Sequence, residues 1–319
     1  MIPADLDKKL AFVICTEPGN LERKSVMLVK TLRAYGGAFK DCLVISYSPR
    51  KGRMPGNKTL KFFRENKVTS IHDTLNRQFA DYGFGNKVVA CADAEKRFDY
   101  ARLIFLDSDM FILQEPVLLW SDDPFVVKVR PVEQKLAGST GADEHAGYWE
   151  KLLRWAGISQ PVYVTTSLSH ERIFGYWNAG VIDAGTQSGF FSHWLRNFEQ
   201  LIEEGLVHPV GMTFMDQIAL ALTAQQKQYA IEELPASYNL PINNRLTPSP
   251  KGGNGQSQDI VIAHYHKLFD SFPLYNPYKV PIADNEDLRS LDRIISESGF
   301  ISINNHLVQR IRTIIRKAK

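Results

Sequence analysis

Two aspartates, Asp107 and Asp109, interrupt the most strand-like stretch of the chain, LIFLDSDMFIL at residues 103–113. Along an extended chain, residues two apart point to the same side, which predicts two neighbouring carboxylates. Such carboxylates repel each other unless a positive group lies between them. Mg²⁺ and Mn²⁺ prefer oxygen ligands and commonly bridge protein carboxylates to substrate phosphates. The pair therefore predicts a metal site, although two solvated acids at a strand end would give the same pattern.

The elements around this pair indicate an α/β fold. Apolar runs predict four strands in the first third of the chain, at residues 10–15, 42–47, 68–71 and 102–106. Helical periodicity separates them at 21–35 and 86–97. Strands separated by helices imply a parallel sheet with right-handed crossovers, and ligands of such sheets bind beyond the carboxyl ends of the strands. Asp107 and Asp109 follow the strand at 102–106, so we expect them at this edge.

The second half of the chain has a more mixed pattern. Strands are predicted at residues 125–130, 178–183 and 259–266, and helices at 190–202 and 213–222. Seven large apolar side chains form one stripe of the helix at 190–202, which predicts that this stripe packs in the core.

Composition limits the class of protein. The chain has 319 residues, is 44% apolar and carries a net charge of +3, which allows one large domain or two modest ones and indicates no nucleic-acid partner. No apolar run approaches the ~20 residues that span a bilayer, and the charged start argues against a secretory leader. Three cysteines, Cys15, Cys42 and Cys91, have no metal-like spacing and are typical of reduced thiols in a cytoplasmic protein.

Several short motifs accompany the acid pair in a fixed order. NK at 86–87 precedes it, and after LDSDMFIL (106–113) come YWNAGVIDAG (176–185), MDQIALAL (215–222), LPASYNLP (234–241) and IAHYHK (262–267). In this order the motifs resemble the GT-A glycosyltransferases, most closely glycosyltransferase family 8, the group of glycogenin and the lipopolysaccharide galactosyltransferases. The resemblance covers about residues 10 to 270. The D-x-D alone is a weak signal, whereas the ordered set is fairly specific.

The resemblance implies a GT-A fold, a Rossmann-like α/β architecture with a mixed, mostly parallel sheet flanked by helices. It implies one glycosyltransferase domain at 1–285, with a nucleotide-binding half at 1–113 and an acceptor half at 114–285. A C-terminal helical basic tail is expected at 286–319.

The resemblance also assigns metal ligands. Asp107, Asp109 and His264 match the residues that hold the cation against the donor diphosphate. Mn²⁺ is expected rather than Mg²⁺, because imidazole suits Mn²⁺ and is marginal for Mg²⁺. His266 lies on the same face of the predicted strand, so it remains open whether His264, His266 or both bind the metal.

Donor-binding and catalytic residues follow from the same motifs. Matches to donor contacts are Thr16 and Glu17 (base and ribose), and Lys87, Asp107, Ser108 and Gly180 (phosphates or sugar). Lys267 is expected to replace the family's phosphate-binding lysine, although its spacing differs from that of the family. Asn178, Asp216 and Gln217 match residues near the transferred sugar and the reacting centre. Tyr238 and Asn239 match a loop contact of undefined role. The chain departs from family 8 after its last strand, where HYHKLFDSFPLYNPY replaces a Gly-containing loop and K-P-W, which leaves the diphosphate contacts and the subfamily open.

The function implied is metal-dependent transfer of a hexose from a nucleotide-sugar, UDP-hexose first, to a hydroxyl of a glycan or glycolipid, with retention of anomeric configuration. One alternative is a non-catalytic nucleotide-sugar or glycan-binding module on the same fold. Another is a haloacid-dehalogenase-like aspartyl phosphatase. That fold places its D-x-D after the first strand and needs a later acidic pair, and Asp122-Asp123 lies too close to Asp109 for that part.

The end of the chain is basic. Residues 303–319 carry five lysines and arginines and no acid, with apolar residues at helical spacing. Such a segment predicts either a helix on an anionic membrane surface, at the inner face of a membrane, or a helix packed on the domain.

Overall fold

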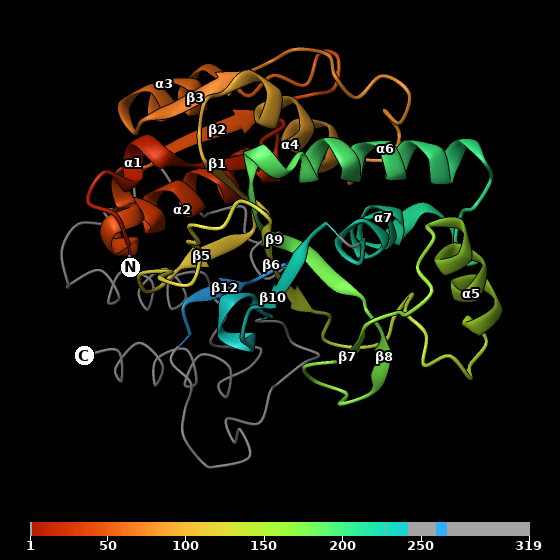
Figure 1. Cartoon of the computed structure of the whole chain (residues 1–319). Coiled ribbons are helices and arrows are strands. Elements are labelled where there is room, and N and C mark those ends of the chain that lie inside the picture. Colours follow the sequence, from red (N-terminus) through yellow and green to blue (C-terminus); the bar gives the residue numbers. More distant parts are fainter. Residues whose placement is uncertain (1, 227, 242–259, 267–319) are drawn as a thin grey trace, which may run out of the picture.

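The structure is a computed structural model that describes residues 2–226, 228–241 and 260–266 (Figure 1). Its main sheet has seven strands in the order β10-β6-β9-β4-β1-β2-β3. They are β1 (Leu10–Cys15), β2 (Leu43–Tyr47), β3 (Val68–Ile71), β4 (Arg102–Leu106), β6 (Val126–Pro131), β9 (Trp177–Gly185) and β10 (Ala230–Glu233). All neighbours are parallel except β9, which is antiparallel to β4 and β6. The expected mixed, mostly parallel sheet is confirmed.

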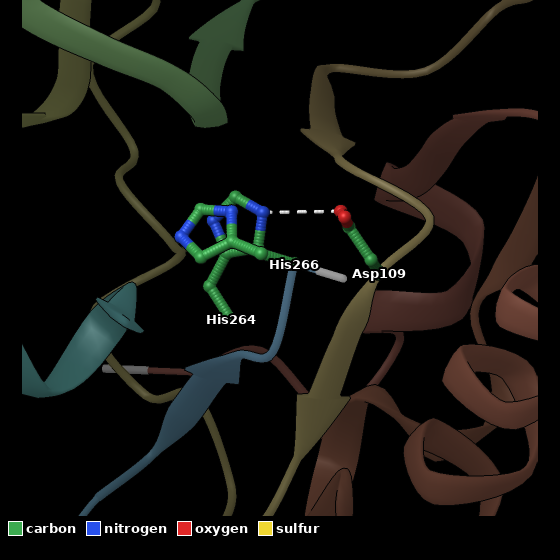
Figure 2. A group of neighbouring side chains, drawn as sticks. All are labelled: Asp109, His264 and His266. Atoms are coloured by element: carbon green, nitrogen blue, oxygen red, sulfur yellow. Dashed lines mark hydrogen bonds and ion pairs between the residues drawn. The ribbon is translucent and has the colours of Figure 1, made fainter. Parts of the chain in front are cut away.

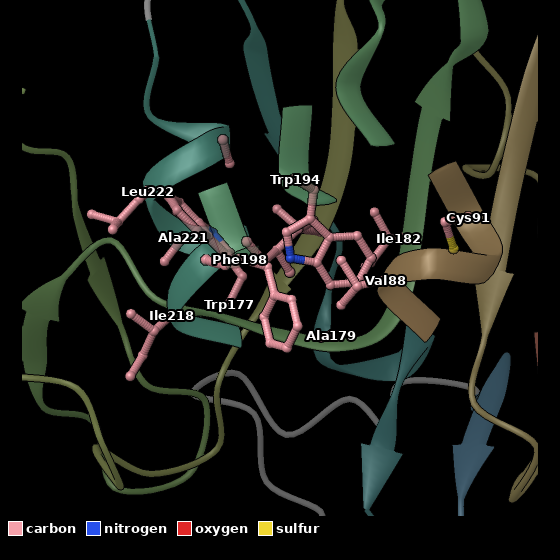
Figure 3. Packing of buried hydrophobic residues seen from close by; sticks show 14 of the residues in the cluster. Val88, Cys91, Trp177, Ala179, Ile182, Trp194, Phe198, Ile218, Ala221 and Leu222 are labelled. Carbon is pink, nitrogen blue, oxygen red and sulfur yellow. The ribbon is translucent and has the colours of Figure 1, made fainter. Parts of the chain in front are cut away.

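Helices cover both faces of this sheet, because its central strands are apolar on both sides. Ala11 and Val13 of β1 belong to the core layer with α4 (Gly85–Arg97), α6 (Phe190–Glu203) and α7 (Met215–Ala224). Phe12 and Ile14 belong to the opposite layer with α2 (Asn20–Tyr35) and α3 (Asn57–Glu65). In the first layer Trp194 packs among side chains of α4, α7 and β9, as Figure 3 shows, so the predicted stripe of α6 is core.

A small second sheet brings distant segments together. It has the order β11-β12-β5, formed by β11 (Leu240–Pro241), β12 (Ile262–His264) and β5 (Met110–Ile112). β12 and β5 are antiparallel, with His264 opposite Met110. This register places His264 next to the residue that precedes β5, which is Asp109.

The remaining elements lie around these sheets. They are α1 (Leu6–Lys9), α5 (Ala146–Trp155), the hairpin of β7 (Tyr163–Thr165) with β8 (Arg172–Phe174), and the 3₁₀ turns η1 (Gly37–Asp41), η2 (Thr186–Ser188), η3 (Met212–Phe214) and η4 (Ala236–Tyr238). Within the described residues, no helix has the length and apolar composition needed to cross a bilayer. The three cysteines are free, with Cys42 and Cys91 buried and Cys15 half-buried.

Two details of local structure differ from the prediction. β4 ends at Leu106 as predicted, but residues 107–109 form a turn before β5, so Asp107 and Asp109 do not lie along an extended chain. The last predicted strand, at 259–266, is limited among its described residues to Ile262–His264, because the chain leaves the small sheet there and His266 takes a positive φ of 50°. The predicted tail at 286–319 and Lys267 lie outside the described residues.

Candidate functional site

One carboxylate and two imidazoles meet at the start of β5 and the end of β12 (Figure 2). His264 Nε2 lies 3.0 Å from Asp109 Oδ1, and the ligand atoms of Asp109, His264 and His266 all lie within 4.8 Å of one another. The two imidazole rings are tilted by 31° to each other, with centroids 3.8 Å apart. The structure therefore brings both candidate histidines to the same carboxylate, although 155 positions separate His264 from Asp109.

Backbone pairing and one lysine hold this group in place. The Tyr265 N–H donates to the carbonyl of Asp109 at 3.0 Å, and the Tyr265 ring stacks on Phe111. Lys24 of α2 donates to the carbonyl of His266 at 2.8 Å, and its Nζ lies 3.5 Å from Asp109 Oδ2. Nothing in the local sequence pattern of α2 marked Lys24 as a site residue.

The electrostatics of the group follow from burial and proximity. Burial alone would raise the pKa of Asp109, but His264 and Lys24 lower it well below its usual value. Burial alone would lower the pKa of His264, but Asp109 raises it above the ordinary value. Burial and the neighbouring His264 lower the pKa of His266 to about 4. His266 is therefore neutral at pH 7, the form in which imidazole binds metals.

Two amide side chains, Asn239 and Asn178, continue the hydrogen-bond chain from His264 on the side away from Asp109. His264 Nδ1 lies 2.9 Å from Asn239 Oδ1, and Asn239 Nδ2 donates to Asn178 Oδ1 at 2.9 Å. Asn178 Oδ1 also accepts the Gly180 N–H at 2.8 Å. Asn178 thus contacts the histidine through Asn239, a residue whose motif was recognised but whose role was not.

A second charged group surrounds Asp107. Lys87 Nζ lies 2.8 Å from Asp107 Oδ1 and 3.6 Å from Asp216 Oδ2, and it donates to the carbonyl of Ala179 at 3.1 Å. The Tyr82 hydroxyl donates to Asp216 Oδ1 at 2.7 Å. Lys87 is 6% exposed and Asp216 2%. Burial would lower the pKa of Lys87, but Asp107 and Asp216 raise it above its usual value, so the lysine stays charged.

The acid pair is arranged differently from the sequence expectation. Because residues 107–109 turn, Asp107 faces Lys87 while Asp109 faces His264. Among the described residues, the group of possible metal ligands contains His266 where Asp107 was expected. Ser108, expected to contact the donor, donates its hydroxyl to the carbonyl of Cys15 and so ties the turn to the end of β1.

The predicted base and ribose contacts are engaged inside the protein. Thr16 is fully buried, donates its hydroxyl to Ser25 and accepts one from Ser46, which leaves it no surface for a ligand. The carboxylate of Glu17 is bonded to Arg50 and to Asn86. Because their burial is this complete and their polar atoms already have partners, the turn after β1 does not present these two side chains openly.

The remaining predicted residues line the same region. Gly180 lies beside the turn at residues 107–109, here called the acid turn, because its carbonyl accepts the Asp107 N–H at 2.8 Å. A Cβ at Gly180 would lie 3.0 Å from Asp107 Oδ2 and 2.9 Å from Asn178 Oδ1, so glycine is required by close approach. Gln217 follows Asp216 on the first turn of α7 and is half-buried.

Comparison with known proteins identifies the class. A family model described as the Rhodobacterales glycosyltransferase domain matches residues 12–228. The chain belongs to this glycosyltransferase family. The predicted transferase class is thereby confirmed, and the phosphatase alternative is excluded. No curated protein matches the chain.

Solved structures similar to this glycosyltransferase are distant. Mouse xyloside xylosyltransferase 1 (apo form) has a TM-score of 0.46 at 13% identity, over 81% of this chain and 97% of that one. The galactosyltransferase LgtC, solved with donor and acceptor sugar analogues, has 0.48 at 11%, over 80% and 86%. The bifunctional glycosyltransferase WbbM has 0.46 at 14%, over 97% of this chain and 52% of its own.

Proposed function

We propose that this glycosyltransferase transfers a hexose from a nucleotide-sugar to a hydroxyl of a glycan or glycolipid, with UDP-hexose as the expected donor. The proposed reaction uses a divalent cation and retains the anomeric configuration. The observation that carries the proposal is the convergence of Asp109, His264 and His266 beside the buried Lys87. Oxygen and imidazole ligands next to a fixed ammonium suit a diphosphate and its cation.

The residues of the group fit a cation. Asp109 Oδ1 and His264 Nε2 face each other at 3.0 Å, and a neutral His266 lies against His264. Asp109, His264 and His266 would hold the ion, and two imidazoles favour Mn²⁺ over Mg²⁺. When bound, the ion would offset negative charge on the departing nucleoside diphosphate.

The protein's own groups position the donor. Lys87 has its ammonium fixed by Asp107, Asp216 and a backbone carbonyl, so its charge needs no reorganisation when a phosphate approaches. Asp216 and Gln217 at the start of α7 are assigned to the reacting centre. The Tyr82 hydroxyl and Lys87 hold the Asp216 carboxylate in one orientation. Lys24 adds a second positive charge near Asp109.

The test combines donor binding with donor consumption. Thermal unfolding is followed with UDP and UDP-hexoses, with and without Mn²⁺, because a ligand that binds only the native state raises its stability. Release of UDP from each donor is measured with glycan acceptors, with and without EDTA. We expect Mn²⁺-dependent stabilisation, and UDP release that EDTA abolishes. Equal UDP release with and without EDTA would contradict the proposal.

Paired variants localise the effect. Asp109→Asn removes the central carboxylate charge and should abolish the Mn²⁺-dependent part of both signals. Asp41→Asn is the matched control, because Asp41 forms an exposed pair with Lys67 on the surface. Donor binding without consumption for any acceptor tested would favour the non-catalytic binding module.

A second proposal concerns the basic segment at 303–319, which lies outside the described residues. We propose that it contacts anionic lipid at the cytoplasmic face of a membrane, because its five basic residues and periodic apolar residues suit such a surface. Co-sedimentation with anionic liposomes should be stronger for the full chain than for a version that ends near residue 300. Equal binding of the two proteins would refute the proposal.

A further inference from the structure

The amides next to His264 have orientations that their neighbours dictate. The Gly180 N–H can only donate, so the atom of Asn178 that it contacts at 2.8 Å must be the oxygen. The other end of Asn178 faces Glu133 Oε2 at 3.4 Å, and a carboxylate accepts hydrogen bonds. The two contacts require the same orientation of the Asn178 amide.

This orientation determines that of the next amide. Because Asn178 presents oxygen, Asn239 must present its NH₂ group, which donates at 2.9 Å. The Asn239 oxygen therefore faces His264 Nδ1, 2.9 Å away. An amide oxygen carries no proton, so the proton of this bond belongs to Nδ1. Asn239 is fully buried and His264 is 5% exposed, so solvent offers no competing partner.

The consequence appears on the other side of the ring. A neutral His264 with its proton on Nδ1 has a lone pair on Nε2, and Nε2 points at Asp109 Oδ1 from 3.0 Å. A lone pair facing a carboxylate is unfavourable unless a proton or a cation lies between them. Hydrogen bonds to the far nitrogen of a ligating histidine fix its tautomer and orientation.

We propose that Asn178 and Asn239 are positioning residues, which hold His264 in the tautomer that leaves Nε2 free for a divalent cation shared with Asp109. The inference rests on the proposed function, because it concerns the cation assigned there. It adds a role for Asn239, and it gives Asn178 a role in orienting a metal ligand besides its assigned place near the sugar.

Mn²⁺ binding to the full chain, measured by titration calorimetry without donor, tests the inference. Asn239→Leu leaves Nδ1 without an acceptor and should weaken Mn²⁺ binding about 10- to 100-fold. Asn239→Asp keeps an oxygen for Nδ1 but turns another toward Asn178 Oδ1, so it should lower thermal stability while Mn²⁺ affinity stays near wild type. This separation of affinity from stability would not follow from a purely structural role.

A matched control removes a buried amide elsewhere. Asn197 donates to Thr223 between α6 and α7 at 2.8 Å, so Asn197→Leu should lower stability without changing Mn²⁺ affinity. If the wild-type chain binds Mn²⁺ and Asn239→Leu binds it equally well, the positioning role is refuted and the proposed function stands. If the wild-type chain does not bind Mn²⁺, the metal in the proposed function fails and this inference fails with it.

A spectroscopic measurement on the wild-type chain needs no folded variant of Asn239. Long-range ¹⁵N–¹H NMR of the metal-free protein distinguishes the two neutral tautomers and the imidazolium, with His264 assigned by the signal lost in His264→Gln. We expect the Nδ1–H tautomer or the imidazolium. A neutral ring protonated on Nε2 would overturn the inference.

Discussion

Gly180→Ala should damage the site more than the fold. The added Cβ would lie 2.8 Å from Met110 Cε, 2.9 Å from Asn178 Oδ1 and 3.0 Å from Asp107 Oδ2, where ordinary contacts begin at 3.4 Å. The methionine methyl is flexible and moves at little cost. Asn178 is held by Gly180 and Asn239, and Asp107 by Lys87, so these two groups must shift by several tenths of an ångström.

The magnitudes follow from this geometry. Overpacking costs typically about 1–3 kcal/mol, and the reduced freedom of the unfolded chain offsets about 0.4–1 kcal/mol. A net loss near 1 kcal/mol lowers the melting temperature by only about 2–4 °C in a chain of this size. A misplacement of about 1 Å costs on the order of 100-fold in rate, so a smaller shift of Asp107 should cost about 10-fold or more.

The assay is UDP release with Mn²⁺, together with thermal unfolding. Gly147→Ala is the matched control, because a Cβ there meets no atom within 4 Å and the residue lies in α5. It should stabilise the protein by about 0.5–1 kcal/mol and leave activity unchanged. Wild-type UDP release by Gly180→Ala would refute the inferred closeness of β9 to the acid turn.

Three further predictions concern metal binding, stability and pH. His264→Ala should abolish Mn²⁺-dependent UDP release while it lowers the melting temperature much less; equal losses would contradict the role of the histidine. In the wild-type chain the fully buried Asp183 carboxylate lies 2.7 Å from Arg102 Nε. Arg102→Ala removes this counter-ion and should lower the free energy of unfolding, measured in urea, by about 3–5 kcal/mol. An unchanged urea midpoint would count against this prediction. Burial alone would raise the pKa of Asp143, but hydrogen bonds from Thr140, Ser139 and Lys135 hold it well below its usual value. Its stabilising contribution is therefore present above the unfolded-state pKa of about 3.9 and lost as pH falls further. The urea midpoints of wild type and Asp143→Asn should differ at pH 6 and converge toward pH 2.

Much of the fold was predictable where the sequence has clear apolar runs. β1 and β4 have the predicted bounds, because strands buried on both faces appear as short continuous apolar runs. β3 also has its predicted bounds, although it is an edge strand in which only Val68 is buried. The helix α5 and the hairpin β7–β8 were not predicted, and in the hairpin the exposed positions mix polar and apolar residues. Tyr163 and Thr165, for example, are exposed on either side of the buried Val164.

The site was predictable as a set of residues and less so as a geometry. Asp109 and His264 were named from motifs, but their contact depends on the pairing of β5 with β12, a register that no local pattern encodes. His266 was left open because it lies on the same face of the predicted strand as His264. In the structure His266 has a positive φ, and its ring lies 3.8 Å from that of His264, centroid to centroid.

The acid pair shows why the sequence argument was incomplete. The spacing of the two carboxylates predicted one cation between them, with two solvated acids as the alternative. In the structure each carboxylate has a lysine of its own, Lys87 for Asp107 and Lys24 for Asp109. Charge balance alone therefore does not require a metal at Asp107. The stronger argument for a cation lies at Asp109. There the hydrogen bond that His264 Nδ1 donates to Asn239 Oδ1 leaves His264 Nε2 facing a carboxylate, and only a proton or a metal ion can join these two atoms.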